Sequence, residues 1–406
     1  MSEAEYIHNA GVHLLTWKEL QIGIRVDRLR DRSDGLTGEI TVKTTLPGMN
    51  PHIHQARLNL LSTVSRRQLA SQLRERLDDS NLTLGLDWNE LIEQTCKAVV
   101  TEHRQGEPVY NLQDIPKRDA LKYRVWPLLA EGQANMLYGA GGSLKSYIAI
   151  YLMVLLDGMP EHNGFQVEPG PTLFLDYETD KYTVKERKDR LVEGIVMHEP
   201  RDSYYRYCQQ PLADDIEEIQ RFVVEKEIQT VIVDSMGSAV GGDTNKEEFI
   251  LAYYRALRSL KITTLTIDHL NKEGKLYGNI YKFNQSRNIW EARKVQEPDG
   301  DKVEVGLFHR KANDGKLLKP IGLQATFSEA AVVLKRINVL DVPELADDAP
   351  IKDRLMKVLL VQGLLTVTSL AQEIEESETS VRMTLHRYKD RFFTKQGESW
   401  GVLQRE

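Results

Sequence analysis

The sequence has few cysteines and no long apolar run. Its two cysteines, Cys96 and Cys208, do not form a C-x-x-C pair, so we expect a reducing compartment and no disulfide scaffold. The ten histidines form no H-E-x-x-H or Cys/His cluster, so no structural zinc site is expected. No apolar run approaches the length of a membrane span, and the first residues, MSEAEYIHNAG, lack a basic and apolar leader. These absences predict a cytoplasmic protein without a membrane-spanning segment.

The charge is close to balanced. The chain has 53 basic and 60 acidic residues and a net charge of -7, which argues against a protein that coats nucleic acid with its whole surface. A local basic channel or patch is still compatible with this sum, because association depends on the field at the site. With 406 residues, of which 41% are hydrophobic and 28% charged, we expect a globular protein of two or three domains.

The first block, residues 1–115, is predicted to be an α+β domain of unknown role. The runs IGIRVDRL and GEITVKTTL flank a turn-rich segment and predict a β-hairpin. Helical spacing of apolar residues predicts helices around Ser65–Leu77 and Trp88–Glu107. The segment GEPVYNLQDIPKRD that follows is typical of a linker.

The second block, residues 120–340, alternates short β-branched runs with helical stretches. Near-continuous apolar strands between helices indicate an α/β fold with a mostly parallel sheet covered on both faces. An acidic stretch bracketed by prolines, DVPELADDAP, marks a second linker before a small third block, residues 350–406. The predicted strands of the second block are ANMLYG, PTLFLDYE, TVIVDS, TTLTIDHL, KVEVGLFH and AVVLKRI.

A glycine-rich octapeptide follows the first of these strands and precedes an apolar helix. Strand, tight glycine turn and helix N-terminus together aim backbone N–H groups at an anion. The octapeptide resembles the phosphate loop G-x-x-x-x-G-K-[ST], in which the lysine reaches the β- and γ-phosphates of ATP and the hydroxyl ligates Mg²⁺. An incidental strand-to-helix turn is the alternative. The predicted phosphate-binding residues are Gly139, Ala140, Gly141, Gly142, Ser143, Leu144, Lys145 and Ser146.

Leu144 occupies the position of the second glycine in that pattern. We expect it to adopt the backbone angles that the missing glycine would have had, at a cost on the order of 1 kcal/mol. Alternatively, Gly141 and Gly142 absorb the turn one step earlier.

Two acidic strand ends complete the predicted nucleotide site. Asp234 ends the run TVIVD and is expected to hold Mg²⁺. Glu178 follows the first strand after the loop helix and is expected to activate the attacking water. Asp176 and Asp180 are the other candidates for activating the water. The alternative to a catalytic role is that this segment is a solvated acidic turn.

These parts, in this order, resemble the RecA-like P-loop ATPases, and within them the hexameric replicative helicases of the DnaB and RepA type. The resemblance spans about residues 125–335. It implies that His269, in TLTIDHLN, senses the γ-phosphate, that Arg287, in NQSRNIW, serves a neighbouring subunit, and that Lys311, in FHRKANDG, supplies a basic finger across the interface. It also implies a homo-oligomer, a hexamer in this family. The N-terminal block does not resemble the helical primase-binding domain of DnaB.

Two regions are candidates for DNA contact. The long loop after His269 carries basic and aromatic residues, a composition suited to a single strand in a central channel; packing of the aromatic rings at a subunit boundary is the alternative. The basic candidates in this region are Lys272, Lys275 and Lys282.

The third block is predicted to be a winged helix. Its recognition helix would span Ser380–Arg391, followed by a hairpin wing. Arg382, Arg387 and Lys389 would contact duplex DNA, although winged helices also serve as protein-docking modules.

The sequence therefore predicts an ATP-dependent DNA translocase, as a hexameric replicative helicase with ATP and Mg²⁺ at subunit interfaces. Two other readings are a RecA-like recombination or repair ATPase that binds DNA without unwinding it, and an ATP-switched winged-helix regulator.

Overall fold

The computed structural model describes residues 4–9, 11–77, 86–106, 109–117, 121–195, 203–270 and 280–403. The chain divides into two compact units. The first comprises Met1–Asp119 with Ile216–Glu225, and the second comprises Ala120–Asp215 with Lys226–Glu406. No helix in the described ranges is long and apolar enough to cross a membrane.

The first unit contains a five-stranded antiparallel sheet in which each strand pairs with its neighbour in sequence. Two helices, α1 (Thr63–Leu77) and α2 (Trp88–Gln105), share one apolar core with the sheet. Alternation of buried and partly exposed residues along β2 is what a sheet with one covered face requires. The predicted hairpin and both predicted helices are confirmed, while the other strands of the sheet were not predicted. The strands are β1 (Glu5–Asn9), β2 (Val12–Trp17), β3 (Ile22–Arg32), β4 (Gly35–Thr44) and β5 (His52–Asn59).

The second unit is built on a sheet of nine strands, in the order β12-β11-β13-β14-β8-β15-β16-β17-β18. The six strands from β12 to β15 are parallel and the last three are antiparallel. The predicted mixed α/β fold with a large, mostly parallel sheet is therefore confirmed. The strands are β8 (Ala134–Gly139), β11 (Thr172–Asp176), β12 (Ser203–Tyr207), β13 (Thr230–Asp234), β14 (Thr263–His269), β15 (Asn288–Val295), β16 (Lys302–Ala312), β17 (Ile321–Phe327) and β18 (Val332–Ile337).

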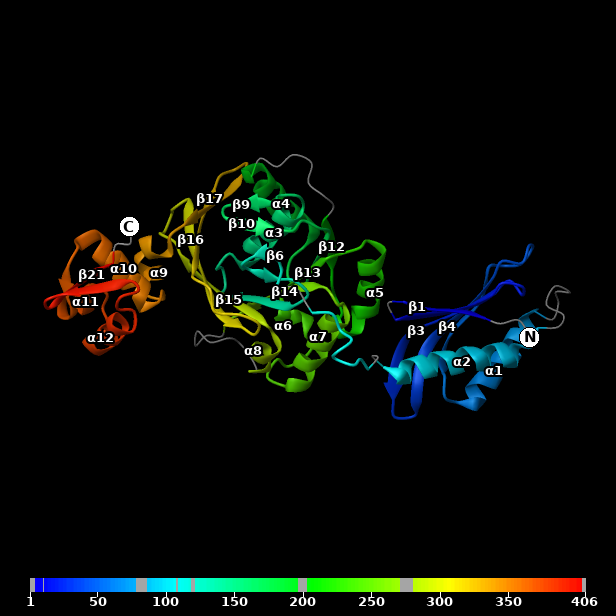
Figure 1. Ribbon diagram of the computed structural model, residues 1–406. Helices are drawn as coiled ribbons and strands as arrows, with labels where there is room; N and C mark the ends of the chain where they lie inside the picture. Colours follow the sequence, from blue (N-terminus) through cyan, green and yellow to red (C-terminus); the bar gives the residue numbers. More distant parts are fainter. Residues whose placement is uncertain are drawn as a thin grey trace. The chain divides into compact units, whose positions relative to one another are not determined.

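Helices cover both faces of this sheet. Figure 1 shows α3 (Lys145–Leu156) and α4 (Lys181–Ile195) over one face, and α6 (Met236–Ala239) and α7 (Glu247–Ser259) over the other. Helix α3 is apolar on nearly all sides, which fits a helix buried in the core. The remaining elements of this region are β6 (Tyr123–Trp126), β7 (Leu129–Ala130), β9 (Glu161–His162), β10 (Phe165–Val167), α8 (Tyr281–Gln285), the 3-10 helix η2 (Val339–Asp341) and α9 (Pro343–Ala346). Helix α5 (Leu212–Glu225) begins in the second unit, and its residues Ile216–Glu225 belong to the first.

The C-terminal part has three helices and a small antiparallel sheet. Its elements are α10 (Ile351–Gln362), β19 (Leu365–Thr366), α11 (Val367–Glu373), α12 (Glu378–Arg387), β20 (Phe393–Gln396) and β21 (Ser399–Val402). Helix α12 begins at Glu378 because Ser377 caps it, accepting from the Ser380 N–H at 3.2 Å. The helix ends at Arg387, four residues earlier than predicted, where the chain turns through Asp390 at φ +62°.

Candidate active site

The carboxyl ends of four parallel strands bring the predicted nucleotide residues to one edge of the sheet. Asp176 at the end of β11 pairs in register with Asp234 at the end of β13. His269 at the end of β14 pairs with Gly139 at the end of β8. Loops that leave neighbouring parallel strands at this edge form the usual ligand crevice of an open α/β sheet.

The phosphate loop joins β8 to α3 through two left-handed residues. Gly142 has φ +71° and Leu144 has φ +60° and ψ 17°. Leu144 therefore takes the expected strained conformation, and Gly142 contributes a second left-handed position. For an L-residue this conformation costs about 1–2 kcal/mol, and the Leu144 side chain offsets part of that cost by packing against the core. Gly139 is required for another reason, because a Cβ there would collide with the Ala292 carbonyl.

Lys145 lies inside this loop. Its side chain is 4% exposed, and Nζ donates to the carbonyl oxygens of Gly139 at 3.0 Å and Ala140 at 2.7 Å, with the Ser143 hydroxyl oxygen at 3.4 Å. Burial lowers the pKa of Lys145, while nearby carboxylates oppose the shift. The loop thus concentrates one ammonium and the N-terminus of α3 at a single point, which suits a phosphate group.

Asp234 fits the role of a Mg²⁺ ligand. The residue is 4% exposed, and the Ser146 side chain opposes the effect of burial on the pKa of Asp234. The Oδ1 atom is buried and has no hydrogen-bond partner among the residues that the structure describes. Burial raises the pKa of Asp234 to about 6. A hard cation prefers oxygen ligands and would satisfy this oxygen, so Asp234 and Ser146 together are suited to Mg²⁺.

Glu178 points toward the same place. Its Oε1 accepts from the Ser235 hydroxyl and lies 3.1 Å from His269 Nε2. The hydrogen bond with His269 lowers the pKa of Glu178 against the opposing effect of burial, and Lys145 adds to the lowering. The structure therefore places an ionised carboxylate between a histidine and the phosphate loop, a position from which it can accept a proton.

The two competitors of Glu178 have structural roles. Asp176 is 1% exposed and accepts from the backbone N–H groups of Glu178 and Thr179 at 3.0 and 2.9 Å, and from the hydroxyl of Tyr205 at 2.9 Å. Asp180 accepts from two N–H groups in the first turn of α4 at 2.8 and 3.1 Å. Both carboxylates hold the turn that presents Glu178, so Glu178 is the one directed at the site.

Arg287 and Lys311 lie at the other edge of the sheet. The Arg287 N–H donates to the Ala134 carbonyl at the start of β8, and its side chain is 55% exposed. Lys311 Nζ donates to three backbone carbonyls at the end of α8, those of Phe283, Asn284 and Ser286, at 2.7 to 3.0 Å. Neither side chain is part of the phosphate-loop cluster of its own chain.

Lys282 is not on the surface. Its side chain is 0% exposed, and Nζ donates to both carboxylate oxygens of Asp268 at 2.9 and 3.2 Å. The prediction that Lys282 contacts DNA is therefore corrected: Lys282 neutralises a buried carboxylate that sits directly before His269. Lys272 and Lys275 lie outside the described residues.

The predicted basic residues of the C-terminal part are exposed. Arg382 and Arg387 lie on α12, and Lys389 follows the helix. Arg382 is 3.8 Å from Glu378 within the same helix, a weak surface pair.

Sequence reasoning missed three residues near the site. Ser235, which follows Asp234 directly, holds Glu178. Asp268, inside the quoted run TLTIDHL, was passed over for its neighbour His269. Lys294 on β15 lies close to the loop, since a Cβ on Gly142 would be 3.9 Å from its Nζ; no signal in the sequence pointed to it, because β15 was not predicted as a strand.

The chain was compared with known protein families and with curated proteins. A family model described as an AAA domain matches residues 107–275, which is fewer than half of the 406 residues, and no curated protein matches the chain. The matched range includes the phosphate loop, Glu178, Asp234 and His269, but neither Arg287 nor Lys311. The match and the large, mostly parallel sheet support a P-loop ATPase, with the nucleotide binding and usual Mg²⁺ dependence that such a domain implies.

Proposed function

We propose that this chain is an ATP-dependent DNA translocase of the hexameric replicative helicase type, which hydrolyses ATP between adjacent subunits. One observation carries the proposal: the residues suited to nucleotide chemistry divide between two opposite edges of the same sheet. Arg287 is level with Ala134, five residues before the loop begins at Gly139, which corresponds to about 16 Å along the strand. An exposed arginine so placed can complete the site of another copy of the chain rather than its own.

Within one chain, each residue has a defined task. Lys145 binds the phosphates, and Ser146 and Asp234 hold Mg²⁺, which when bound neutralises charge on the phosphate oxygens. Glu178 orients the attacking water and accepts its proton, and its depressed pKa keeps it ionised for this task. His269, in contact with Glu178, is positioned to respond to the γ-phosphate.

Charge that develops on the transferred phosphoryl group needs more cations than Lys145 and Mg²⁺ supply. Arg287 is the better candidate for the residue that reaches the neighbouring site, because its side chain is 55% exposed and its ion pair with Asp314 is long, at 3.7 Å. Lys311 would have to leave three carbonyl acceptors at the end of α8 to reach a neighbour. Because hydrolysis would require an arginine from the adjacent subunit, ATP would be hydrolysed only in the assembled protein.

DNA is the proposed polymer partner. His269, which contacts Glu178, ends β14 at the site edge of the sheet, and Lys272 and Lys275 follow it in the sequence. These two lysines are the proposed contacts to single-stranded DNA. The exposed Arg382, Arg387 and Lys389 at α12 supply a second basic surface, which as a winged helix would contact duplex DNA.

Two measurements test the proposal. ATP hydrolysis should accelerate when single-stranded DNA is added, and a labelled strand should be displaced from a duplex with one polarity. Stimulation without displacement would contradict the helicase and favour a recombination or repair ATPase.

The exposed basic residues of α12 favour a second candidate, an ATP-switched DNA-binding regulator. Slow hydrolysis that DNA does not affect, with sequence-specific duplex binding that survives high salt, would establish the regulator instead.

A further inference from the structure

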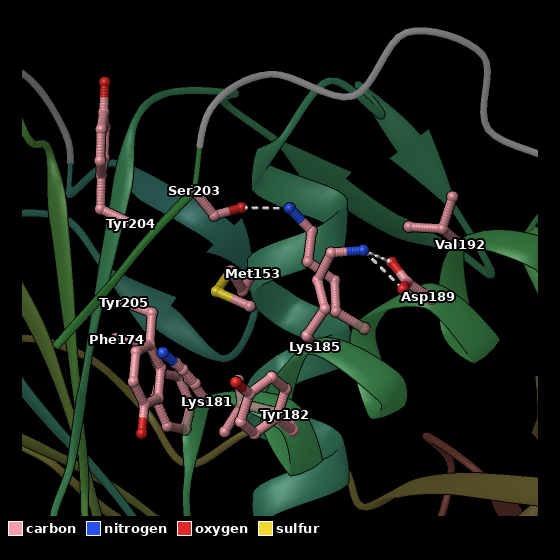
Figure 2. Close-up of a pocket in the computed structure, with 12 residues that line it drawn as sticks. Met153, Phe174, Lys181, Tyr182, Lys185, Asp189, Val192, Ser203, Tyr204 and Tyr205 are labelled. Carbon is pink, nitrogen blue, oxygen red and sulfur yellow. Dashed lines mark hydrogen bonds and ion pairs between the residues drawn. The ribbon is translucent and has the colours of Figure 1, made fainter. Parts of the chain in front are cut away.

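A pocket separate from the phosphate loop opens between α4 and β12, the strand at the end of the nine-stranded sheet. Its volume is ≈ 670 Å³, within the range of small-molecule sites. Met153 of α3 and Phe174 of β11 form its floor, and none of the residues 139–146 lines it. Figure 2 shows the side chains that line the pocket, which come from these four elements.

One end of the pocket is aromatic. In Figure 2, Phe174, Tyr205 and Tyr182 lie close together beside Lys181. The Tyr205 hydroxyl donates to Asp176 at 2.9 Å, so the Tyr205 ring, and not its hydroxyl, lines the pocket. Tyr182 is 74% exposed, which is unusual for a large side chain and leaves part of its ring accessible to a ligand.

The pocket is also basic. Its lining includes three lysines and one aspartate. Lys185 pairs with Asp189 at 2.5 Å, and Lys188 pairs with the buried Asp157 at 2.7 Å and donates to Ser203 Oγ at 2.6 Å. Lys181 forms no ion pair with another described residue, and its Nζ lies 5.1 Å from the centre of the Tyr182 ring. The Lys181 ammonium, which forms no ion pair with a described residue, therefore lies beside an exposed aromatic ring.

We propose that this pocket binds a nucleoside phosphate, with the base stacked on Tyr182 and Tyr205 and the phosphate at Lys181. A ligand with both a planar ring and an anionic group matches the two features that lie side by side here, the exposed Tyr182 ring and the Lys181 ammonium that forms no ion pair with a described residue. The ligand is either a free nucleotide or one nucleotide unit of a single strand. This proposal goes beyond the function proposed above, because it does not depend on whether the protein translocates on DNA.

The test measures binding of deoxythymidine monophosphate and of a short oligothymidylate to the full chain by calorimetry, with the phosphate loop saturated by ADP and Mg²⁺. We expect binding at one site per chain. Tyr182→Ala and Lys181→Ala should each weaken it about tenfold, as expected for the loss of one stacked ring or one phosphate contact. The matched control is Tyr207→Ala, which removes an exposed tyrosine of β12, the strand that carries Tyr205, and Tyr207 does not line the pocket.

Each outcome is decisive. Binding of the mononucleotide that the two pocket variants weaken and the control preserves supports a free-nucleotide site. Binding of the oligothymidylate alone, with the same pattern among the variants, supports a strand contact. Absence of binding to wild-type protein that still binds ADP overturns the proposal, and so does binding that neither pocket variant weakens.

Discussion

Substitution of Lys282 distinguishes a buried structural charge from a DNA contact. Lys282→Met keeps most of the side-chain length but leaves the Asp268 carboxylate, whose side chain is 2% exposed, without its cation. Removing one partner of a buried ion pair costs about 3–5 kcal/mol. In a unit of this size each kcal/mol lowers the melting temperature by about 2–4 °C, so we expect a fall on the order of 10 °C.

The assay is scanning calorimetry of the full chain with a matched control and a rescue. Lys335→Met removes an exposed lysine of β18, in the same unit as Lys282, and should change the free energy of unfolding by less than about 0.5 kcal/mol. Combining Lys282→Met with Asp268→Asn should recover part of the loss, because the remaining partner no longer carries a charge that burial disfavours. An unchanged melting temperature with weaker DNA binding would refute the reasoning, because it would show that Lys282 is an exposed DNA contact.

Three other predictions follow from the site and the first unit. Lys145→Ala should abolish ATP hydrolysis because it removes the ammonium at the phosphate loop; turnover at the wild-type rate would remove that assignment. Glu178→Gln should still bind ATP but lower kcat about 10²- to 10⁴-fold, whereas loss of ATP binding with normal kcat would indicate a structural role. Burial lowers the pKa of His13 to about 4, so the unfolded chain takes up the proton first as the pH falls. Stability of the first unit should therefore decrease from about pH 6.5 to pH 4, by up to about 3 kcal/mol, and an equally steep decrease in His13→Phe would contradict this.

The local parts of the site could be predicted because each is encoded in a short run. A strand, a glycine turn and a helix start are consecutive in sequence, so the phosphate loop and the left-handed conformation of Leu144 followed from the octapeptide alone. The choice of Glu178 over Asp176 and Asp180 needed the structure. All three lie within five residues, and only their hydrogen bonds show which ones hold the turn.

Features that depend on pairing between distant residues could not be predicted. Lys282 looked like one of several basic residues in a polar loop, and only its contact with Asp268, fourteen residues earlier, shows that it is buried. The strand β15 carries several charged residues, so its sequence did not indicate a central strand of the sheet. Those charges are accommodated by pairs such as Glu291 with Arg293 and Arg310.

The central claim is that a site is completed by the neighbouring subunit, and a mixing experiment tests it most directly. Arg287→Ala subunits keep an intact phosphate loop, and Lys145→Ala subunits keep an intact finger, so each alone should be inactive. Mixed in one assembly, they should recover part of the ATP hydrolysis, because some interfaces pair a wild-type loop with a wild-type arginine. Assemblies that contain both variants and show no recovered hydrolysis would contradict the account.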